Sequence, residues 1–94
     1  MSPWHSLILF VTAENVFSAK QKLGEILKGT RWEHLKLEIR DMAEHAKSAT
    51  LYRIKSTPAL VLRGNKLKRV FHDLDDELSI RAALGGTFPN SPSS

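Results

Sequence analysis

The residues of this chain that could carry out chemistry are few and scattered. It has no cysteine, which excludes a disulfide, a thiolate nucleophile, a CxxC redox pair and a cysteine-ligated metal. The four histidines lie far apart, and no two have the i, i+4 spacing of paired metal ligands on a helix: His5, His34, His45 and His72. Neither a glycine-rich phosphate loop nor a persuasive Ser-His-Asp order occurs. We therefore expect no enzymatic activity, no cofactor and no metal site.

The densest run of carboxylates lies between Asp73 and Glu77. It coincides with the expected start of the last helix. There, carboxylates stabilise free N–H groups and the positive end of the helix dipole. We interpret the run as a helix start rather than a metal site.

A basic cluster is formed by Lys66, Lys68 and Arg69, with Arg63 nearby. The chain of 94 residues has 14 Lys and Arg against 10 Asp and Glu, a net charge of +4 that permits an anionic partner without demanding one. The cluster either contacts an acidic protein surface or a phosphate, or it is a solvated strand face whose lysines prevent aggregation. A small basic nucleic-acid-binding domain is the alternative function. Nucleic acid is the less favoured partner, because Phe71 alone is weak support for base stacking.

The elements that must position these residues follow from the spacing of apolar side chains. In the first half we predict a strand buried on both faces, a helix and an edge strand: Ser6–Thr12, Val16–Lys28 and Leu35–Arg40. Asn15 or Ser18 is expected to cap the helix. The edge strand alternates strictly, which predicts apolar side chains facing inward and charged ones facing water: Leu35, Leu37 and Ile39 against Lys36, Glu38 and Arg40.

The second half begins with Asp41, which is expected to cap a helix at Met42–Tyr52 whose small alanine face buries little area. Pro58 directly precedes an apolar strand, Ala59–Leu62, at a position where strands tolerate proline. A turn, a return strand and a last helix follow: Arg63–Lys66, Leu67–His72, and a helix from Asp73 or Asp75–Asp76 to Leu84. Alternation along the return strand predicts opposite faces for Lys68 and Arg69. Trp4 and Trp32 flank strands and are interpreted as packing anchors.

The resulting order is β-α-β-α-β-β-α. The first two strands should be parallel through a right-handed crossover, and the last two should form an antiparallel hairpin. This is the thioredoxin-like order of the α/β class, with a mixed four-stranded sheet, and we expect a cis peptide bond at Pro58. Residues 1–86 are predicted to form a single domain and 87–94 a disordered tail. The longest apolar run, Leu7–Val11, is too short for a bilayer, so we expect a cytoplasmic protein without a membrane partner.

Several segments resemble the KaiB-like family, which includes the circadian clock protein KaiB and the sensor domain of the clock histidine kinase SasA. Leu7–Ser18 (LILFVTAENVFS) is similar to the family's first strand and helix start, and Leu37–Pro58 to its second strand, second helix and Thr-Pro. Lys68–Leu74 (KRVFHDL) resembles the family's basic-basic-apolar-apolar-Gly-Asp-Leu stretch, and Thr57–Val61 (TPALV) resembles the start of the third strand in the SasA domain. The resemblance extends over residues 6–84.

The resemblance implies a non-enzymatic protein-binding module. Its implied partner is a KaiC-like ATPase ring, with a histidine kinase or a KaiA-like protein as further candidates, in circadian or stress-related regulation. Homo-oligomerisation is left open.

Candidate partner-binding residues fall in three places. Asn15, Phe17 and Ser18 lie where a thioredoxin has its CxxC, and they form either a docking surface or an ordinary helix start. Lys36 and Arg40 mark an edge strand that either accepts a partner strand or is simply solvated. The hairpin and the segment after it supply the remaining candidates: Lys66, Lys68, Arg69 and Asp73. Thr57 and Pro58 are expected to be structural.

Overall fold

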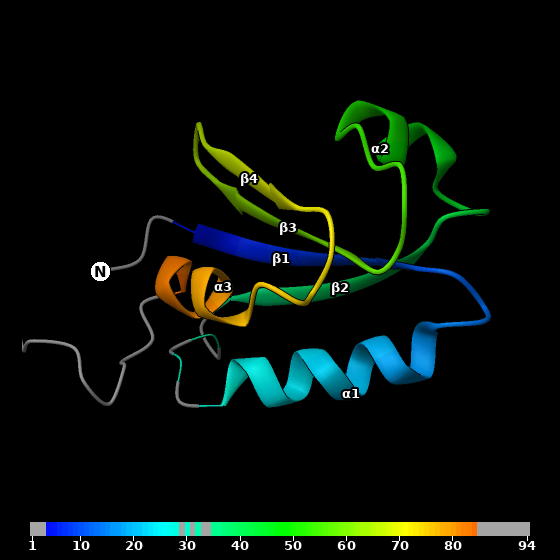
Figure 1. Cartoon of the computed structure of the whole chain (residues 1–94). Coiled ribbons are helices and arrows are strands. Elements are labelled where there is room, and N and C mark those ends of the chain that lie inside the picture. Colours follow the sequence, from blue (N-terminus) through cyan, green and yellow to red (C-terminus); the bar gives the residue numbers. More distant parts are fainter. Residues whose placement is uncertain (1–3, 29, 31, 33–34, 85–94) are drawn as a thin grey trace, which may run out of the picture.

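The chain folds into one mixed sheet, seen in the computed structural model in Figure 1, which describes residues 4–28, 30, 32 and 35–84. The strands are β1 (Trp4–Val11), β2 (Lys36–Asp41), β3 (Ala59–Gly64) and β4 (Lys68–Phe71). Their order across the sheet is β2-β1-β3-β4; β1 and β2 are parallel, and the other two pairs are antiparallel. The predicted thioredoxin-like order is confirmed.

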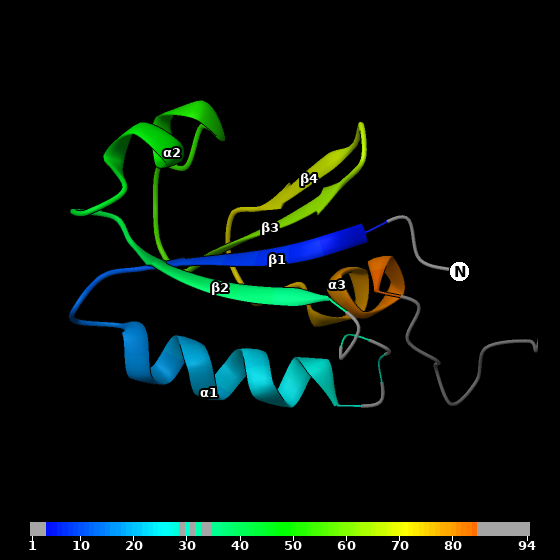
Figure 2. The same cartoon turned by 180° about the vertical axis from the view of Figure 1, so that it is seen from behind.

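In the described part of the chain, three helices cover the two faces of this sheet: α1 (Val16–Leu27), α2 (Ala46–Leu51) and α3 (Glu77–Ala83). Figures 1 and 2 show α1 and α3 on one face and α2 on the other. The arrangement follows from β1, which is buried on both faces and needs apolar cover on each side. None of the helices in the described residues is long and apolar enough to cross a membrane.

Two hydrophobic clusters lie back to back across β1 and β3. Alternate residues of β1 separate into them, with Leu7 and Leu9 facing α1 and α3, and Ile8 and Phe10 facing α2. The α1 and α3 side is the larger one. It holds most of the fully buried leucines and isoleucines, because both of its helices present long apolar side chains.

The second helix is shorter than predicted. The spacing predicted Met42–Tyr52, but α2 begins at Ala46. Asp41 remains in β2 and does not cap the helix: its carboxylate accepts the Ala43 N–H at 2.7 Å, which closes a turn between the strand and the helix. Only Ala49 of α2 is buried, as the alanine-rich face suggested.

The edge strand β2 differs from its predicted pattern. Leu37 and Ile39 face the α1 side but remain 36% and 38% exposed, because α1 does not extend over the strand's outer edge. Arg40, predicted to face water, is partly covered and donates to the Ser48 hydroxyl of α2 at 3.0 Å. Each face of β2 is therefore half-covered.

The start of the last helix and the packing of both tryptophans are as predicted. Asp76 caps α3, its carboxylate accepting the Ser79 N–H at 3.4 Å. Trp4 donates its indole N–H to the Ala83 carbonyl at 2.8 Å, and Trp32 packs on the larger cluster. The predicted tail, 87–94, lies outside the described residues.

Candidate protein-docking surfaces

The loop between β1 and α1 is tied to the loop before β3 by Asn15. Its side-chain oxygen accepts the Thr12 N–H at 2.8 Å, and its side-chain nitrogen donates to the Thr57 hydroxyl at 2.8 Å. Asn15 is thus the N-cap residue by position, but its side chain makes no capping bond, contrary to the prediction. Ser18 does not cap the helix either, because its hydroxyl donates to the Asn15 carbonyl at 3.2 Å instead of accepting a backbone N–H. The Thr57–Pro58 bond is cis.

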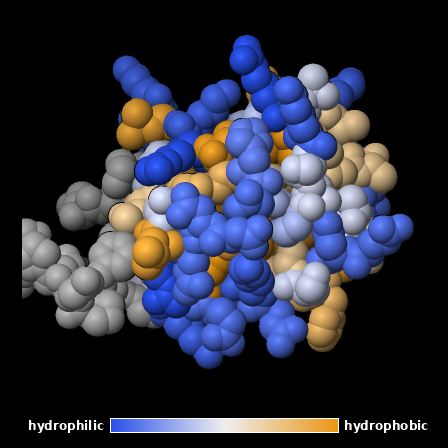
Figure 3. All heavy atoms as spheres, viewed as in Figure 1, coloured by the Kyte–Doolittle hydropathy of each residue, from blue (hydrophilic) through white to orange (hydrophobic). Residues whose placement is uncertain are grey.

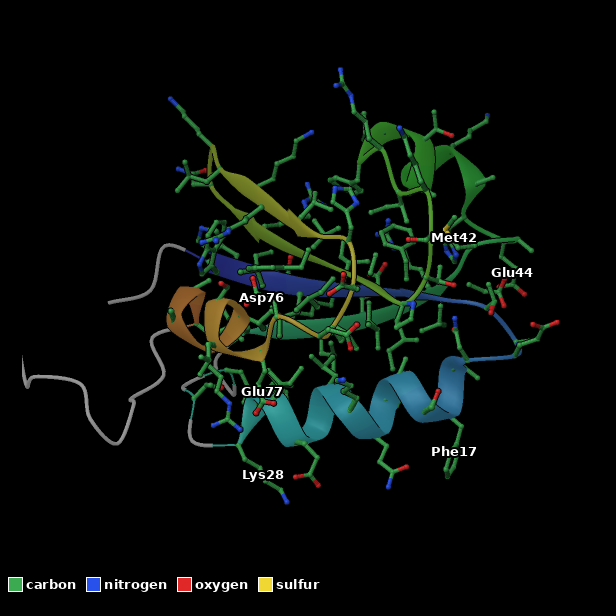
Figure 4. All side chains as sticks on the ribbon, in the orientation of Figure 1. Phe17, Lys28, Met42, Glu44, Asp76 and Glu77 are labelled. Atoms are coloured by element: carbon green, nitrogen blue, oxygen red, sulfur yellow. The ribbon has the colours of Figure 1, made fainter. Side chains whose placement is uncertain are left out.

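Phe17 projects from the first turn of α1 beside this fixed loop. Its side chain is 81% exposed, the most exposed of the large apolar side chains in the described residues. Figure 4 shows it pointing away from the sheet and into solvent. We call Asn15, Phe17, Ser18, Thr57 and Pro58 the α1 surface. It places one large exposed apolar side chain next to a loop that the Asn15–Thr57 bond holds. Aromatic side chains are enriched at protein-binding sites.

The β3–β4 hairpin and the end of α2 enclose a basic groove of about 350 Å³. It is lined by Leu51, Tyr52, Arg63, Gly64, Asn65, Lys66, Leu67 and Lys68, and we call it the hairpin groove. The Arg63 guanidinium lies 6.0 Å and the Lys68 ammonium 5.5 Å from the Tyr52 ring centre. Tyr52 was not among the residues predicted for this site. Its only signal was an aromatic residue at the end of an otherwise small-residue helix.

Lys68 and Arg69 point to opposite faces of the hairpin, as predicted. Arg69 lies on the other side, with its guanidinium 4.8 Å from the Phe71 ring centre. The Tyr52 and Phe71 rings are buried, at 7% and 8% exposure, and cations lie over them. Neither ring is available for base stacking, so the geometry adds no support for nucleic-acid binding.

The remaining candidates are separate from these two surfaces. Arg40 pairs with Glu38 on β2, and this pairing holds the pKa of the Glu38 carboxyl below its usual value. Lys36 is exposed on the same strand. Asp73 accepts the Asp75 N–H at 2.9 Å in the loop before α3. Asp75 in turn pairs with Lys22 of α1 at 2.9 Å, and this pair raises the pKa of Lys22.

The structure therefore distributes the predicted residues instead of gathering them. The α1 surface follows the carboxyl end of β1, whereas the hairpin turn lies beside the start of β1, where Gly64 is opposite Trp4. Figure 3 shows hydrophilic side chains over most of one face, with apolar side chains in small separate patches. Among the described residues there is no group of three His, Asp or Glu that could hold a metal.

Neither a scan against protein-family models nor a search of curated proteins finds a match for this sequence. Among solved structures, the chain is similar to the N-terminal domain of SasA from Synechococcus elongatus. The TM-score is 0.68 and the identity 27%, over 94% of this chain and 91% of that one.

Two further structures share the fold. A malarial protein has a TM-score of 0.65 and 15% identity over 84% of this chain and 91% of its own. A designed protein has a TM-score of 0.64 and 18% identity over 89% and 76%. At such identities the likeness concerns the fold alone. It is the SasA likeness that bears out the resemblance found in the sequence: this chain is a thioredoxin-like α/β domain similar to the KaiB-like N-terminal domain of SasA.

Proposed function

We propose that this chain is a non-enzymatic protein-binding module that docks on a KaiC-type ATPase ring through the α1 surface. The observation that carries the proposal is the likeness to the SasA N-terminal domain across nearly the whole of both chains. The sequence resemblance to KaiB-like proteins supports the same class of partner.

The α1 surface supports the proposal physically. Interfaces derive most of their binding energy from a few large side chains that become buried at the centre, and aromatic residues are prominent among them. Phe17 is a large aromatic side chain that is 81% exposed in the isolated chain, so a partner could bury it. The Asn15–Thr57 bond holds the base of this surface, so little ordering entropy is lost on binding.

The chemistry of the same position supports binding over redox catalysis. In a thioredoxin, the start of the first helix carries the redox cysteines. Here the corresponding residues are Asn15 to Ser18, and no cysteine occurs anywhere in the chain. Thiol–disulfide exchange requires a thiolate, so these residues cannot carry out the reaction of a thioredoxin.

The hairpin groove is the second contact that we propose. Arg63, Lys66 and Lys68 give it a positive potential, and Leu51 and Leu67, 68% and 54% exposed, give it apolar walls. An acidic surface with apolar side chains fits this composition. Charges at the rim of an interface mainly raise the association rate and its sensitivity to salt.

The experiment is a binding titration of the purified chain against a KaiC-type ATPase ring of the same organism, with ATP and with ADP. Phe17→Ala is expected to weaken binding by roughly thirtyfold or more, as expected for a central aromatic anchor. The matched control is Leu78→Ala, because Leu78 is an equally apolar side chain, 67% exposed on α3 away from the α1 surface. It should leave the affinity unchanged.

The outcome that contradicts the proposal is the absence of a complex in both nucleotide states. Equal losses for Phe17→Ala and Leu78→Ala would exclude the α1 surface as the docking site. Lys66→Glu with Lys68→Glu should slow association and reduce its salt dependence, with a smaller effect on dissociation.

A further inference from the structure

The outer edge of β2 is a free strand edge with an apolar groove beside it. β2 ends the strand order, and no strand of the described residues lies beyond it. The groove holds about 140 Å³ between β2 and α1, and Leu37, Ile39, Leu23, Leu27 and Trp32 contribute to its walls. The half-exposed Leu37 and Ile39 place the groove and the free edge side by side.

Backbone alternation shows which groups β2 offers at this edge. The Met42 N–H donates to the Val11 carbonyl at 2.8 Å, so even-numbered positions of β2 point their backbone groups toward β1. Strand backbone groups alternate, so the N–H and C=O of Leu37 and Ile39 point outward. They are the groups that a further strand would pair with.

The charges along the same strand are self-complementary. On the α2 side they alternate as Lys36 (+), Glu38 (−) and Arg40 (+). A second β2 running antiparallel, with the two-fold axis at Leu37, places each Lys36 opposite Glu38 of the other copy. On the α1 side the same register places the two Leu37 side chains opposite one another, and Ile39 opposite Leu35 of the other copy.

The existing Arg40–Glu38 ion pair favours this register over the adjacent ones. Arg40 already contacts Glu38 and Ser48, and its side chain is only 19% exposed, so it is poorly available to a second copy. Lys36 is exposed and remains available. The Glu38 side chain is 42% exposed, and Arg40 contacts its Oε2, so its Oε1 can accept from the incoming Lys36.

We propose that the β2 edge pairs antiparallel with the β2 edge of a second copy of this chain, joining the two sheets into one and the two apolar grooves into one strip. The inference goes beyond the proposed function and is independent of it. The shared edge is short, so we expect a reversible dimer governed by concentration. Phe17 and the hairpin groove lie outside the shared edge.

The test is sedimentation of the full chain over a concentration series from micromolar to millimolar, with circular dichroism to confirm folding. The wild type is expected to show a monomer–dimer equilibrium. Glu38→Lys and Lys36→Glu each make two attractive cross-strand pairs repulsive, and each is expected to weaken dimerisation about tenfold. The double variant Lys36→Glu/Glu38→Lys restores opposite charges in this register and is expected to recover dimerisation.

Two controls separate this interface from general effects. Glu14→Lys makes the same change in net charge as Glu38→Lys, but in the loop before α1, and it should leave the dimer unaffected. Amide exchange at Leu37 and Ile39 should slow with rising concentration in the wild type and not in Lys36→Glu. Lys36→Glu keeps the test valid even if Glu38→Lys, which also loses the Arg40 pair, fails to fold.

A chain that stays monomeric at all concentrations overturns the proposal. It does so even if this edge then pairs with a strand of a different protein. A dimer that is insensitive to the single reversals, that is weakened equally by Glu14→Lys, or that is not recovered in the double variant also overturns it.

Discussion

Asn15 shows how one side chain can join two loops that are far apart in sequence. Its amide donates and accepts at once, with Thr12 on one side and Thr57 on the other. A serine or aspartate at an N-cap usually serves the helix alone. Here the Asn15 side chain accepts no N–H from the first turn of α1. It instead connects the α1 surface to the loop that precedes β3.

We predict that Asn15→Ala lowers the free energy of unfolding by about 1–3 kcal/mol, because it removes two hydrogen bonds from a part-buried position. Asn15→Asp should lose less, since its carboxylate still accepts from the Thr12 N–H and can accept from the Thr57 hydroxyl. Urea unfolding of both variants at one protein concentration measures the difference. Equal stability of Asn15→Ala and the wild type would show that the bridge contributes nothing.

Glu38 and Arg40 predict how stability depends on pH. Arg40 lowers the pKa of the folded-state Glu38 carboxyl below 4.5, chiefly through its hydrogen bond. The folded state therefore releases this proton more readily than the unfolded state. The stabilisation of the folded state by the Glu38–Arg40 pair is fully present above pH 4.5 and is lost as the pH falls through the folded-state pKa of Glu38.

Arg40→Gln should raise the Glu38 pKa toward 4.5 and remove this part of the acid dependence. NMR titration of the Glu38 carboxyl provides the measurement. Ser48→Ala is the matched control, since it removes only the hydroxyl that Arg40 contacts and leaves both charges in place. A Glu38 titration that is the same in the wild type and Arg40→Gln would contradict the assignment.

At the scale of elements, α1 is the best-anchored helix but contains a glycine. Ala19, Leu23, Ile26 and Leu27 are buried along one stripe. Arg81 of α3 donates to the Glu25 carbonyl at 2.9 Å and to the Lys28 carbonyl at 3.2 Å, so α3 supplies partners for the end of α1.

Gly24 is exposed in the interior of this helix, and a Cβ there would meet no atom within 4 Å. Gly24→Ala is therefore expected to raise the free energy of unfolding by about 0.5–1 kcal/mol, through helix propensity alone. Thermal and urea unfolding measure the gain. Gln21→Ala, at another exposed position of α1, should change the free energy of unfolding by only a few tenths of the change expected for Gly24→Ala. A loss of stability in Gly24→Ala would contradict the expectation that a Cβ fits at this position without a clash.

The opposite case is α2, a helix of six residues with one buried alanine. Its alanine face adds little apolar area to the smaller cluster, to which Tyr52, just beyond the helix, contributes more. It nevertheless forms one wall of the hairpin groove, so part of that groove rests on the weakest helix of the three.

At the scale of the whole molecule, stability is unevenly distributed across the sheet. β1 and β3 are central, and residues 7–11 and 59–62 are buried in them. β2 and α2 lie at the margin. The α1 surface is attached to the strong centre, whereas the hairpin groove is attached partly to the margin.

We therefore predict that native-state amide exchange is slowest in β1 and β3 and fastest in α2, with α2 opening well below the global free energy of unfolding. The internal control is α1, also a surface helix, which should exchange more slowly than α2 because it buries four residues. Exchange of α2 at the global rate would show instead that both faces unfold together.

The order of the elements, the doubly buried first strand and the absence of thiol chemistry could all be predicted from the sequence. These depend on residue type and local periodicity, which need no knowledge of neighbours. The sequence also identified the hairpin cations, their opposite faces, and the family resemblance. The predictions were wrong where contacts distant in sequence override a local pattern. Asp41 closes a turn instead of starting a helix, and Leu37 and Ile39 are half exposed instead of buried.

The fold brings together residues whose association the local patterns do not predict. It linked Asn15 to Thr57 over 42 positions of sequence, placed Lys68 and Arg63 over Tyr52, and set the α1 surface and the hairpin turn at opposite ends of β1. These contacts depend on strand order and on how far each helix extends over the sheet. Local patterns of side chains do not reveal those distances, because the distances result from packing the whole core at once.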